Sequence, residues 1–263
     1  MQLQRIAMVV EFDGRLYHGW QRQDNAISAQ AVLEDALAAI EQRPVPLVAA
    51  GRTDAGVHAE ALMLHCDVDA SRWARAPRAY TQGVNRILPD GVSVTGVTGV
   101  AEGFHARFGC LERRYRYQIW NRNTPSAIHR WRHWWMPRPL DLDAMREASK
   151  HLLGEHDFSA FRASGCQAPT AVRELRHIGI EGYGWEINID IHGNAFLYHM
   201  VRNIVGTLVE VGTRRRSPAQ VQDTLKQKDR TLAGVTAPAH GLYFSDALYA
   251  GFSARALVGV EGS

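Results

Sequence analysis

Segments with the apolar pattern of strands alternate along this chain with segments patterned like helices. Segment 6–12 predicts a strand, and the helical spacing of apolar residues in 26–41 predicts a helix. Ser28 is a suitable N-cap for this helix, and Pro44 lies beyond its end. Further strands are expected at 62–68, 92–100, 112–120, 173–181, 185–192 and 242–249, and further helices at 77–87, 140–153 and 196–211 and from Ser217-Pro218 onward. This order predicts an α+β fold with a mostly antiparallel sheet.

The second half of the chain repeats the order of elements in the first. We interpret residues 1–102 and 103–250 as two similar ferredoxin-like-type halves, with helices on one face of the sheet and a binding cleft on the other. No low-complexity linker separates the halves, so a single unit is expected, followed by a C-terminal tail at 251–263.

Composition excludes several classes of protein. A length of 263 residues is enough for a substantial core, and no apolar run is long enough to span a membrane. The N-terminal apolar segment 6–11 is too short and too soon charged for a signal peptide, so a cytoplasmic location is expected. Cys66, Cys110 and Cys166 are odd in number and far apart, and no metal-binding motif is present, so neither a disulfide framework nor a metal site is expected.

The decapeptide 51–60 places a guanidinium (Arg52), a hydroxyl (Thr53) and a carboxylate (Asp54) between Gly51 and Gly56, directly after the apolar run 47–50, and an imidazole (His58) follows two residues later. A strand that ends at glycine commonly presents its next residues on a loop, where they are available for chemistry. The alternative is an Asx-type turn in which Asp54 bonds its own backbone and Arg52 is merely solvated. The decapeptide alone favours the turn.

The segment 103–139 is rich in arginine and aromatic residues and holds a single acid, Glu112. Its arginines and aromatic residues are Arg107, Arg113, Arg114, Arg116, Arg122, Arg130, Arg132, Arg138, Phe104, Phe108, Tyr115, Tyr117, Trp120, Trp131, Trp134 and Trp135. Arginine binds phosphates and aromatic rings stack on unpaired bases, so the segment predicts contact with RNA, and the expected cleft becomes an RNA-binding cleft. The alternative is a solvated strand face with a core tryptophan cluster. Arg214-Arg215-Arg216 forms a smaller second basic patch.

Two further residues bear on the chemistry. Tyr115 shares one face of its expected strand with Tyr117, and either or both tyrosines could line a pocket. Arg202 lies inside an apolar helix, where it needs either solvent or an acid partner, and Asp54 is a candidate for that partner. An ionised carboxylate beside a stacking aromatic ring in an arginine-rich cleft points to an aspartate-dependent enzyme that modifies RNA.

Several segments in one order resemble the tRNA pseudouridine synthase A family. They are Phe12-Asp13-Gly14, Tyr17-His18-Gly19-Trp20-Gln21, Gly51 to Ala59, Phe104-His105-Ala106-Arg107, Arg113 to Tyr117, Gly154 to Phe158 with Phe161-Arg162, His199 to Thr207, and Pro238 to Leu242. The resemblance extends over nearly the whole chain. One departure is segment 61–66, which is more apolar than the small, polar stretch expected there and has Cys66 where an aromatic residue is common.

The resemblance implies conversion of uridine to pseudouridine at positions 38, 39 and 40, in the anticodon stem-loop of tRNAs. It implies that Asp54 is the catalytic aspartate, that Tyr115 stacks on the target base, that Arg202 pairs with the aspartate and that Arg52 helps to hold the base out of the stem. It also implies a homodimer with tRNA crossing both subunits, and no cofactor. His58 becomes a structural residue on this interpretation.

Two other functions remain as alternatives: an inert RNA-binding protein that uses the same cleft, and an aspartate-dependent hydrolase of nucleosides or nucleic acids. The action of Asp54 also stays open at this point. It could add to ribose C1′, add to uracil C6 or abstract a ribose proton.

Overall fold

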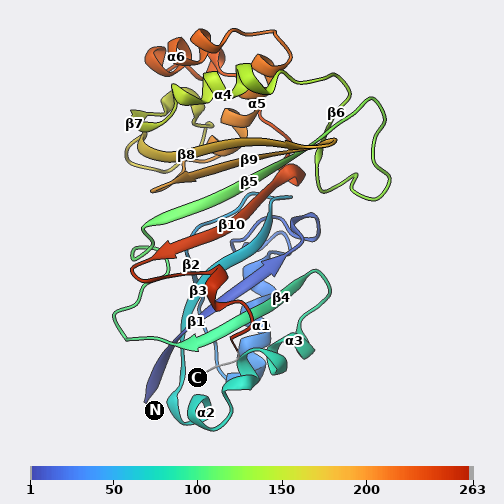
Figure 1. The fold of residues 1–263 in the computed structure, drawn as a ribbon. Coiled ribbons are helices and arrows are strands. Elements are labelled where there is room, and N and C mark those ends of the chain that lie inside the picture. Colours follow the sequence, from blue (N-terminus) through green and yellow to red (C-terminus); the bar gives the residue numbers. More distant parts are fainter. Residues whose placement is uncertain (1, 261–263) are drawn as a thin grey trace. The chain divides into compact units, whose positions relative to one another are not determined.

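The computed structural model describes residues 2–260, which form two compact units. The first unit contains the chain up to Arg113 together with the residues from Phe244 onward, and the second contains Arg114–Tyr243 (Figure 1). These bounds differ from the halves at 1–102 and 103–250, because the last long strand belongs for most of its length to the first unit. The duplication of a ferredoxin-like half stays a prediction.

The sheet of the first unit has the strand order β4-β1-β3-β10. Its strands are β1 (Leu3–Phe12), β2 (Val48–Ala49), β3 (His58–Asp69), β4 (Val92–Gly99), β10 (Leu242–Tyr249) and β11 (Phe252–Ser253). Strand β1 is central and antiparallel to both neighbours, with Val9 opposite Met63 on β3 and opposite Gly96 on β4. Residues Ile6 to Val10 are fully buried, which explains why this part of β1 is apolar at every position rather than alternating.

Helix α1 (Ala29–Glu41) is the longest helix of the first unit. The Ser28 side chain accepts a hydrogen bond from the Ala31 N–H at 3.2 Å, so the expected N-cap is confirmed. Leu33 and Leu37, one turn apart, are completely buried on the side that faces the sheet. The expected helix at 77–87 is instead a 3-10 turn (Pro77–Tyr80) followed by α3 (Gln82–Ile87), and α2 (Ala70–Arg75) was not predicted.

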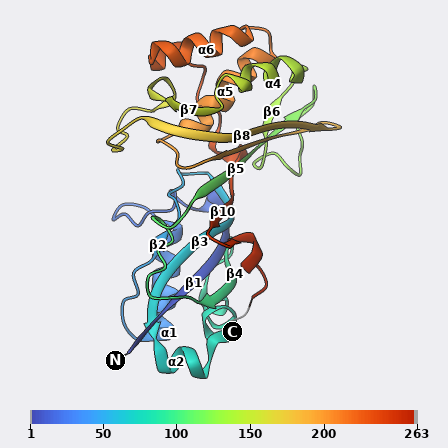
Figure 2. The same cartoon turned by 60° about the vertical axis from the view of Figure 1, so that its left-hand side comes forward.

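The sheet of the second unit has the order β5-β9-β8-β7. Its strands are β5 (Glu112–Asn121), β6 (Trp134–Met136), β7 (Gly154–Asp157), β8 (Val172–Tyr183) and β9 (Glu186–Gly193). The pairs β7–β8 and β8–β9 are antiparallel, whereas the short β6 runs parallel to β5. Helices α4 (Leu142–Lys150), α5 (Met200–Gly212) and α6 (Pro218–Gln227) gather on one side of this sheet (Figure 2).

The secondary structure confirms most of the expected strands and corrects two bounds that matter below. Helix α5 begins at Met200 and not at 196, since His199 has a left-handed backbone with φ of 59°. Trp185 lies in the β8–β9 turn rather than in a strand, after Gly184 with φ of 62°. The mixed α+β class and the mostly antiparallel pairing are confirmed.

Across residues 2–260, every helix is too short or too polar to cross a membrane.

Candidate functional site

The loop between β2 and β3 carries Arg52 and Asp54. Arg52 is exposed and Asp54 is half-buried, whereas Thr53 between them is buried. The Val57 N–H donates to the Asp54 carbonyl at 3.1 Å and closes a turn. Gly56 occupies that turn with φ of 82°, a conformation that favours glycine. The decapeptide therefore does form a turn, and the turn leaves the Asp54 side chain partly open to solvent.

A second segment, between β1 and α1, packs against this turn. A Cβ on Gly14 would lie 2.1 Å from the Val57 carbonyl oxygen, and one on Gly19 would lie 2.7 Å from the Thr53 carbonyl oxygen. The Trp20 N–H donates to that same Thr53 oxygen at 3.1 Å. Only glycine permits so close an approach of two backbones, so the turn is fixed on both sides of Asp54.

His58 lies beneath the turn and is 1% exposed. Its Nδ1 is 3.2 Å from the Gly14 backbone nitrogen, which donates to it, and 3.3 Å from Asp13 Oδ1. Asp13 is in turn paired with Arg15. The imidazole therefore joins the start of β3 to the segment that holds the turn, as a structural residue does.

Thr53 was noted in the loop, but its hydroxyl was given no role from the sequence. Its side chain is buried, and its Oγ1 has no hydrogen-bond partner within residues 2–260. A buried hydroxyl without a partner costs free energy in the folded protein. The sequence offered no signal for it, because a threonine beside a catalytic candidate looks the same whether its hydroxyl is bonded or not.

The two tyrosines of β5 have different surroundings in the second unit. The Tyr117 ring is fully buried, its hydroxyl donates to the Pro238 carbonyl at 2.8 Å, and burial raises its pKa well above the usual value. Tyr115 is 7% exposed and meets the edge of the Phe196 ring, with 5.0 Å between ring centroids. Tyr117 is therefore a core residue, and Tyr115 is less completely buried, so a substrate role for Tyr115 stays a prediction.

Arg202 is half-buried in the first turn of α5. Its Nε donates to the Ala237 carbonyl at 2.7 Å, and the Ala237 N–H donates back to the Arg202 carbonyl at 3.1 Å. The neighbouring Asn203 is completely buried and accepts from Thr236 at 2.6 Å, which fixes the same loop to α5. The Arg202 side chain is thus held by a rigid connection. Because Arg202 and Asp54 belong to different units, their pairing stays a prediction.

Three arginines of the segment 103–139 are engaged inside the fold. Arg113 donates to the carbonyls of Ala50 and Cys110, and Arg116 pairs with Asp190 at 2.9 Å. Arg122 lies over the rings of Trp120 and Trp185, 5.0 and 4.8 Å from their centroids. The structure thus shows that part of this segment serves packing, whereas Arg107, Arg130, Arg132 and Arg138 are exposed.

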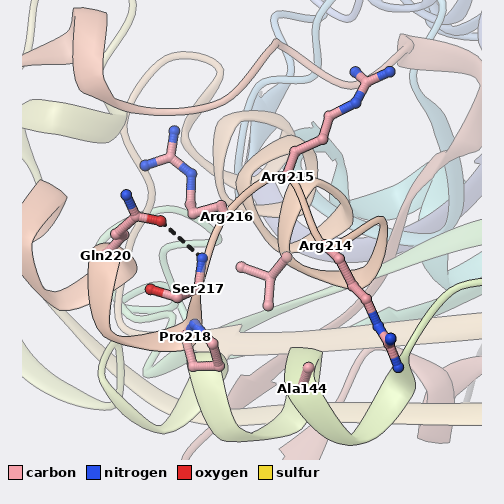
Figure 3. Close-up of a pocket in the computed structure, with 8 residues that line it drawn as sticks. Ala144, Arg214, Arg215, Arg216, Ser217, Pro218 and Gln220 are labelled. Atoms are coloured by element: carbon pink, nitrogen blue, oxygen red, sulfur yellow. Dashed lines mark hydrogen bonds between the residues drawn. The ribbon is translucent and has the colours of Figure 1, made fainter.

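A shallow depression of about 440 Å³ lies where α6 begins (Figure 3). It is lined by Ala144, Val211, Arg214, Arg215, Arg216, Ser217, Pro218 and Gln220. Arg216 pairs with Glu210 at 3.1 Å and Arg214 with Asp141 at 3.3 Å, and the three guanidinium groups point in different directions. The second basic patch is therefore largely neutralised and does not converge on one ligand.

No three histidine, cysteine or acidic side chains in the described part of the chain are placed to share a metal ion. Cys66, Cys110 and Cys166 carry free thiols, and burial raises the pKa of the first two.

Comparison with known proteins identifies the family, which the geometry of the site alone does not. Residues 148–250 match the family model described as tRNA pseudouridine synthase. Three relatives carry the name tRNA pseudouridine synthase A. The protein from Hydrogenovibrio crunogenus is 49% identical over 93% of this chain and 92% of its own, and that from Pseudoalteromonas atlantica is 48% identical over 93% and 92%. The protein from Aeromonas hydrophila is 47% identical over 93% of this chain and 90% of its own.

Among solved structures, a Cbf5-Nop10-Gar1 complex superposes on 78% of this chain and 45% of its own at 13% identity. The TM-score of 0.36 is too low to define a shared fold.

These matches define an isomerase that acts on tRNA and converts uridine to pseudouridine. At identities of 47–49% over more than nine-tenths of the chain, the protein belongs to the tRNA pseudouridine synthase A family.

Proposed function

We propose that Asp54 is the catalytic residue of this isomerisation and that the target uridines are those at positions 38, 39 and 40, in the anticodon stem-loop. One observation carries the assignment: Asp54 is a half-buried carboxylate on a turn whose backbone is fixed by Gly14 and Gly19. A carboxylate fixed in this way is suited to meet a reacting atom in one geometry.

The bonds broken and formed in the reaction are compatible with catalysis by a single carboxylate. The bond from ribose C1′ to uracil N1 breaks, a bond from C1′ to C5 forms, and the proton lost from C5 is balanced by the proton gained at N1. Product and substrate are isomers, so the overall reaction consumes no co-reactant, and we infer that no cofactor is needed. Asp54 acts as an ionised group in each of the three possible first steps: addition to C1′, addition to C6, or removal of a ribose proton.

The remaining site residues support Asp54. We infer that Arg202 pairs with it and so favours the ionised carboxylate. Tyr115 is proposed to stack on the target base, and the edge of the Phe196 ring, 5.0 Å away between centroids, supports this by fixing the tyrosine ring in one position. Arg52 is exposed two residues before Asp54, a position suited to holding the base outside the stem.

We also infer that the enzyme works in the cytoplasm as a homodimer, with one tRNA crossing both subunits. The large number of exposed arginines supports an extended RNA surface.

The test is replacement of Asp54 by asparagine. Asp54→Asn is expected to abolish pseudouridine formation, read by carbodiimide and primer extension, while tRNA affinity stays within a few-fold. The matched control is Asp24→Asn, an exposed aspartate of the same unit that should keep full activity. Normal product from Asp54→Asn would refute the assignment, and a wild-type protein that binds tRNA without modifying it would favour the inert RNA-binding protein.

A further inference from the structure

We propose that the loop 122–133 of the second unit is a docking surface for tRNA, in which an unpaired base stacks on Trp131 and Arg130 contacts the RNA backbone. The proposal rests on the proposed function only in taking tRNA as the ligand. It assigns to this loop binding of RNA outside the chemistry of Asp54.

Large apolar side chains are exposed on and beside this loop. Ile128 is 86% exposed and Trp131 is 53% exposed. Trp185 in the β8–β9 turn is 57% exposed and Trp135 on β6 is 41% exposed. Several large apolar side chains exposed on and beside one loop are a mark of an interaction surface.

The loop is held by hydrogen bonds of its own and to its neighbours. Its first part is closed by Arg122, which donates to the carbonyls of Thr124 and Pro125 at 2.9 and 3.1 Å. The Ser126 hydroxyl accepts from the His129 N–H at 3.1 Å. Its end is fixed where the Tyr243 hydroxyl donates to the Arg132 carbonyl at 2.8 Å. A long loop held by its own contacts keeps its surface ready to bind, so little conformational entropy is lost when a ligand docks.

Trp131 has a position suited to stacking. The Arg130 guanidinium lies 5.4 Å from the centroid of the indole ring, and the His240 ring meets it edge-on, with 5.9 Å between centroids. These neighbours orient the indole and leave half of its surface to solvent. Arg130 is exposed and pairs with no carboxylate within residues 2–260, so its charge is available to a phosphate.

The charge of this region selects RNA over a second copy of the chain. Between Glu112 and Asp141 the sequence contains no acidic residue, and Arg130, Arg132 and Arg138 are all exposed. In a two-fold dimer built on this surface, two positive loops would face each other and repel. A polyanion with unpaired bases complements both the charge and the exposed indole.

The test measures the Kd for unmodified tRNA by filter binding at fixed ionic strength. Trp131→Ala is expected to weaken binding about fivefold or more, because loss of one stacked base costs about 1–3 kcal/mol. Trp131→Phe should stay within about twofold of wild type, since a smaller ring still stacks. Arg130→Ala should weaken binding and lower its dependence on salt. The matched control is Tyr183→Ala, which removes a 64% exposed aromatic ring whose hydroxyl donates to Glu181, and it should bind tRNA normally.

Circular dichroism checks that each variant is folded, and light scattering gives its mass. Unchanged tRNA affinity of folded Trp131→Ala would overturn the proposal. A change in oligomeric mass would also overturn it, because the surface would then be a contact between copies. Failure of the catalytic assignment looks different: Asp54→Asn would make product whatever the affinity of the Trp131 variants.

Discussion

The backbone of Gly19 lies against that of Asp54: a Cβ at Gly19 would be 3.2 Å from the Asp54 carbonyl carbon and 2.7 Å from the preceding Thr53 oxygen. Gly19 also has φ of 86°, so two separate constraints select glycine there. The segment that precedes α1 thus sets where the candidate carboxylate stands, although the two are more than thirty residues apart in the sequence.

Gly19→Ala is expected to lower kcat by about tenfold or more while KM for tRNA changes little. The added methyl group displaces the turn, and a displacement of about 1 Å can cost about a hundredfold in rate. The matched control is Gly251→Ala, at φ of 87° with nothing within 4 Å of the added Cβ. Both variants bear the same backbone strain of about 1–2 kcal/mol, and only Gly19→Ala adds a clash, so its melting temperature should fall further than that of Gly251→Ala. Equal kcat values for the two variants would show that Gly19 does not position Asp54.

Thr53→Val tests the unbonded hydroxyl beside Asp54. Removing a buried hydroxyl that has no partner among the described residues should leave the melting temperature unchanged or raise it. We nevertheless expect kcat/KM to fall about fivefold, because a hydroxyl beside the candidate carboxylate that makes no bond within the described residues can donate to a substrate group. Thr224→Val is the opposite case: its hydroxyl donates to the Gln220 carbonyl at 2.8 Å, so stability should fall by about 1 kcal/mol with the activity of the folded enzyme intact. Full activity of Thr53→Val would leave this hydroxyl without a role.

The stability of the protein at acid pH should depend on one ion pair of the second unit, that of Asp157 with Lys228. The Lys228 ammonium, 2.8 Å away, and the Ser159 hydroxyl lower the pKa of Asp157 from 3.8 to about 2. A carboxyl group whose pKa is lowered by folding stabilises the folded state above its unfolded pKa. The contribution is therefore complete above about pH 4 and is lost as the pH falls to about 2. Because the pair is partly exposed, we expect no more than about 1 kcal/mol. Measured by urea unfolding, Asp157→Asn should be less stable than wild type at pH 7 and equally stable at pH 2. Equal losses of stability at both pH values would contradict this account.

The elements of the fold follow from the sequence where the pattern is local. The alternation of buried and half-buried residues in β9, the apolar run of β1 and the Ser28 cap of α1 all lie where the pattern indicated. The start of α5 was wrong by four residues, because the run from Phe196 onward is as apolar as a helix core. The left-handed backbone of His199 stops the helix there, and no rule of periodicity predicts a positive φ at histidine.

The sequence identified the loop of the candidate site, but it did not show what holds that loop in place. Asp54 and Arg52 could be selected because their residue types are chemically informative. The roles of Gly14 and Gly19 could not, since they depend on which backbone passes within 3 Å of each. The basic segment was predicted as one RNA surface, yet Arg113 and Arg116 serve the fold because the acceptors they meet lie far away in the sequence.

The two tyrosines of β5 give a paired test of substrate stacking. Tyr115→Phe keeps the ring and removes the hydroxyl, so we expect activity to fall more than tRNA binding. Tyr117→Phe removes a hydroxyl that donates to the Pro238 carbonyl inside the core, and should cost about 1 kcal/mol of stability with little change in kcat. The measurements are kcat, Kd and melting temperature for each variant. Equal losses of activity and binding in Tyr115→Phe would identify it as a structural residue like its neighbour.

Arg202→Met tests the proposed partner of Asp54. Its Nε bond to Ala237 fixes the side chain, but the main-chain bond from Ala237 to the Arg202 carbonyl remains in the variant, so the fold should survive. Loss of the guanidinium removes the charge that favours an ionised Asp54, and we expect kcat to fall about a hundredfold or more with an unchanged circular dichroism spectrum. Arg216→Met is the matched control, because it breaks an arginine–carboxylate pair with Glu210 at the far end of the same helix and should alter stability alone. If Arg202→Met kept both its fold and its activity, the proposed pair of Arg202 and Asp54 would be wrong.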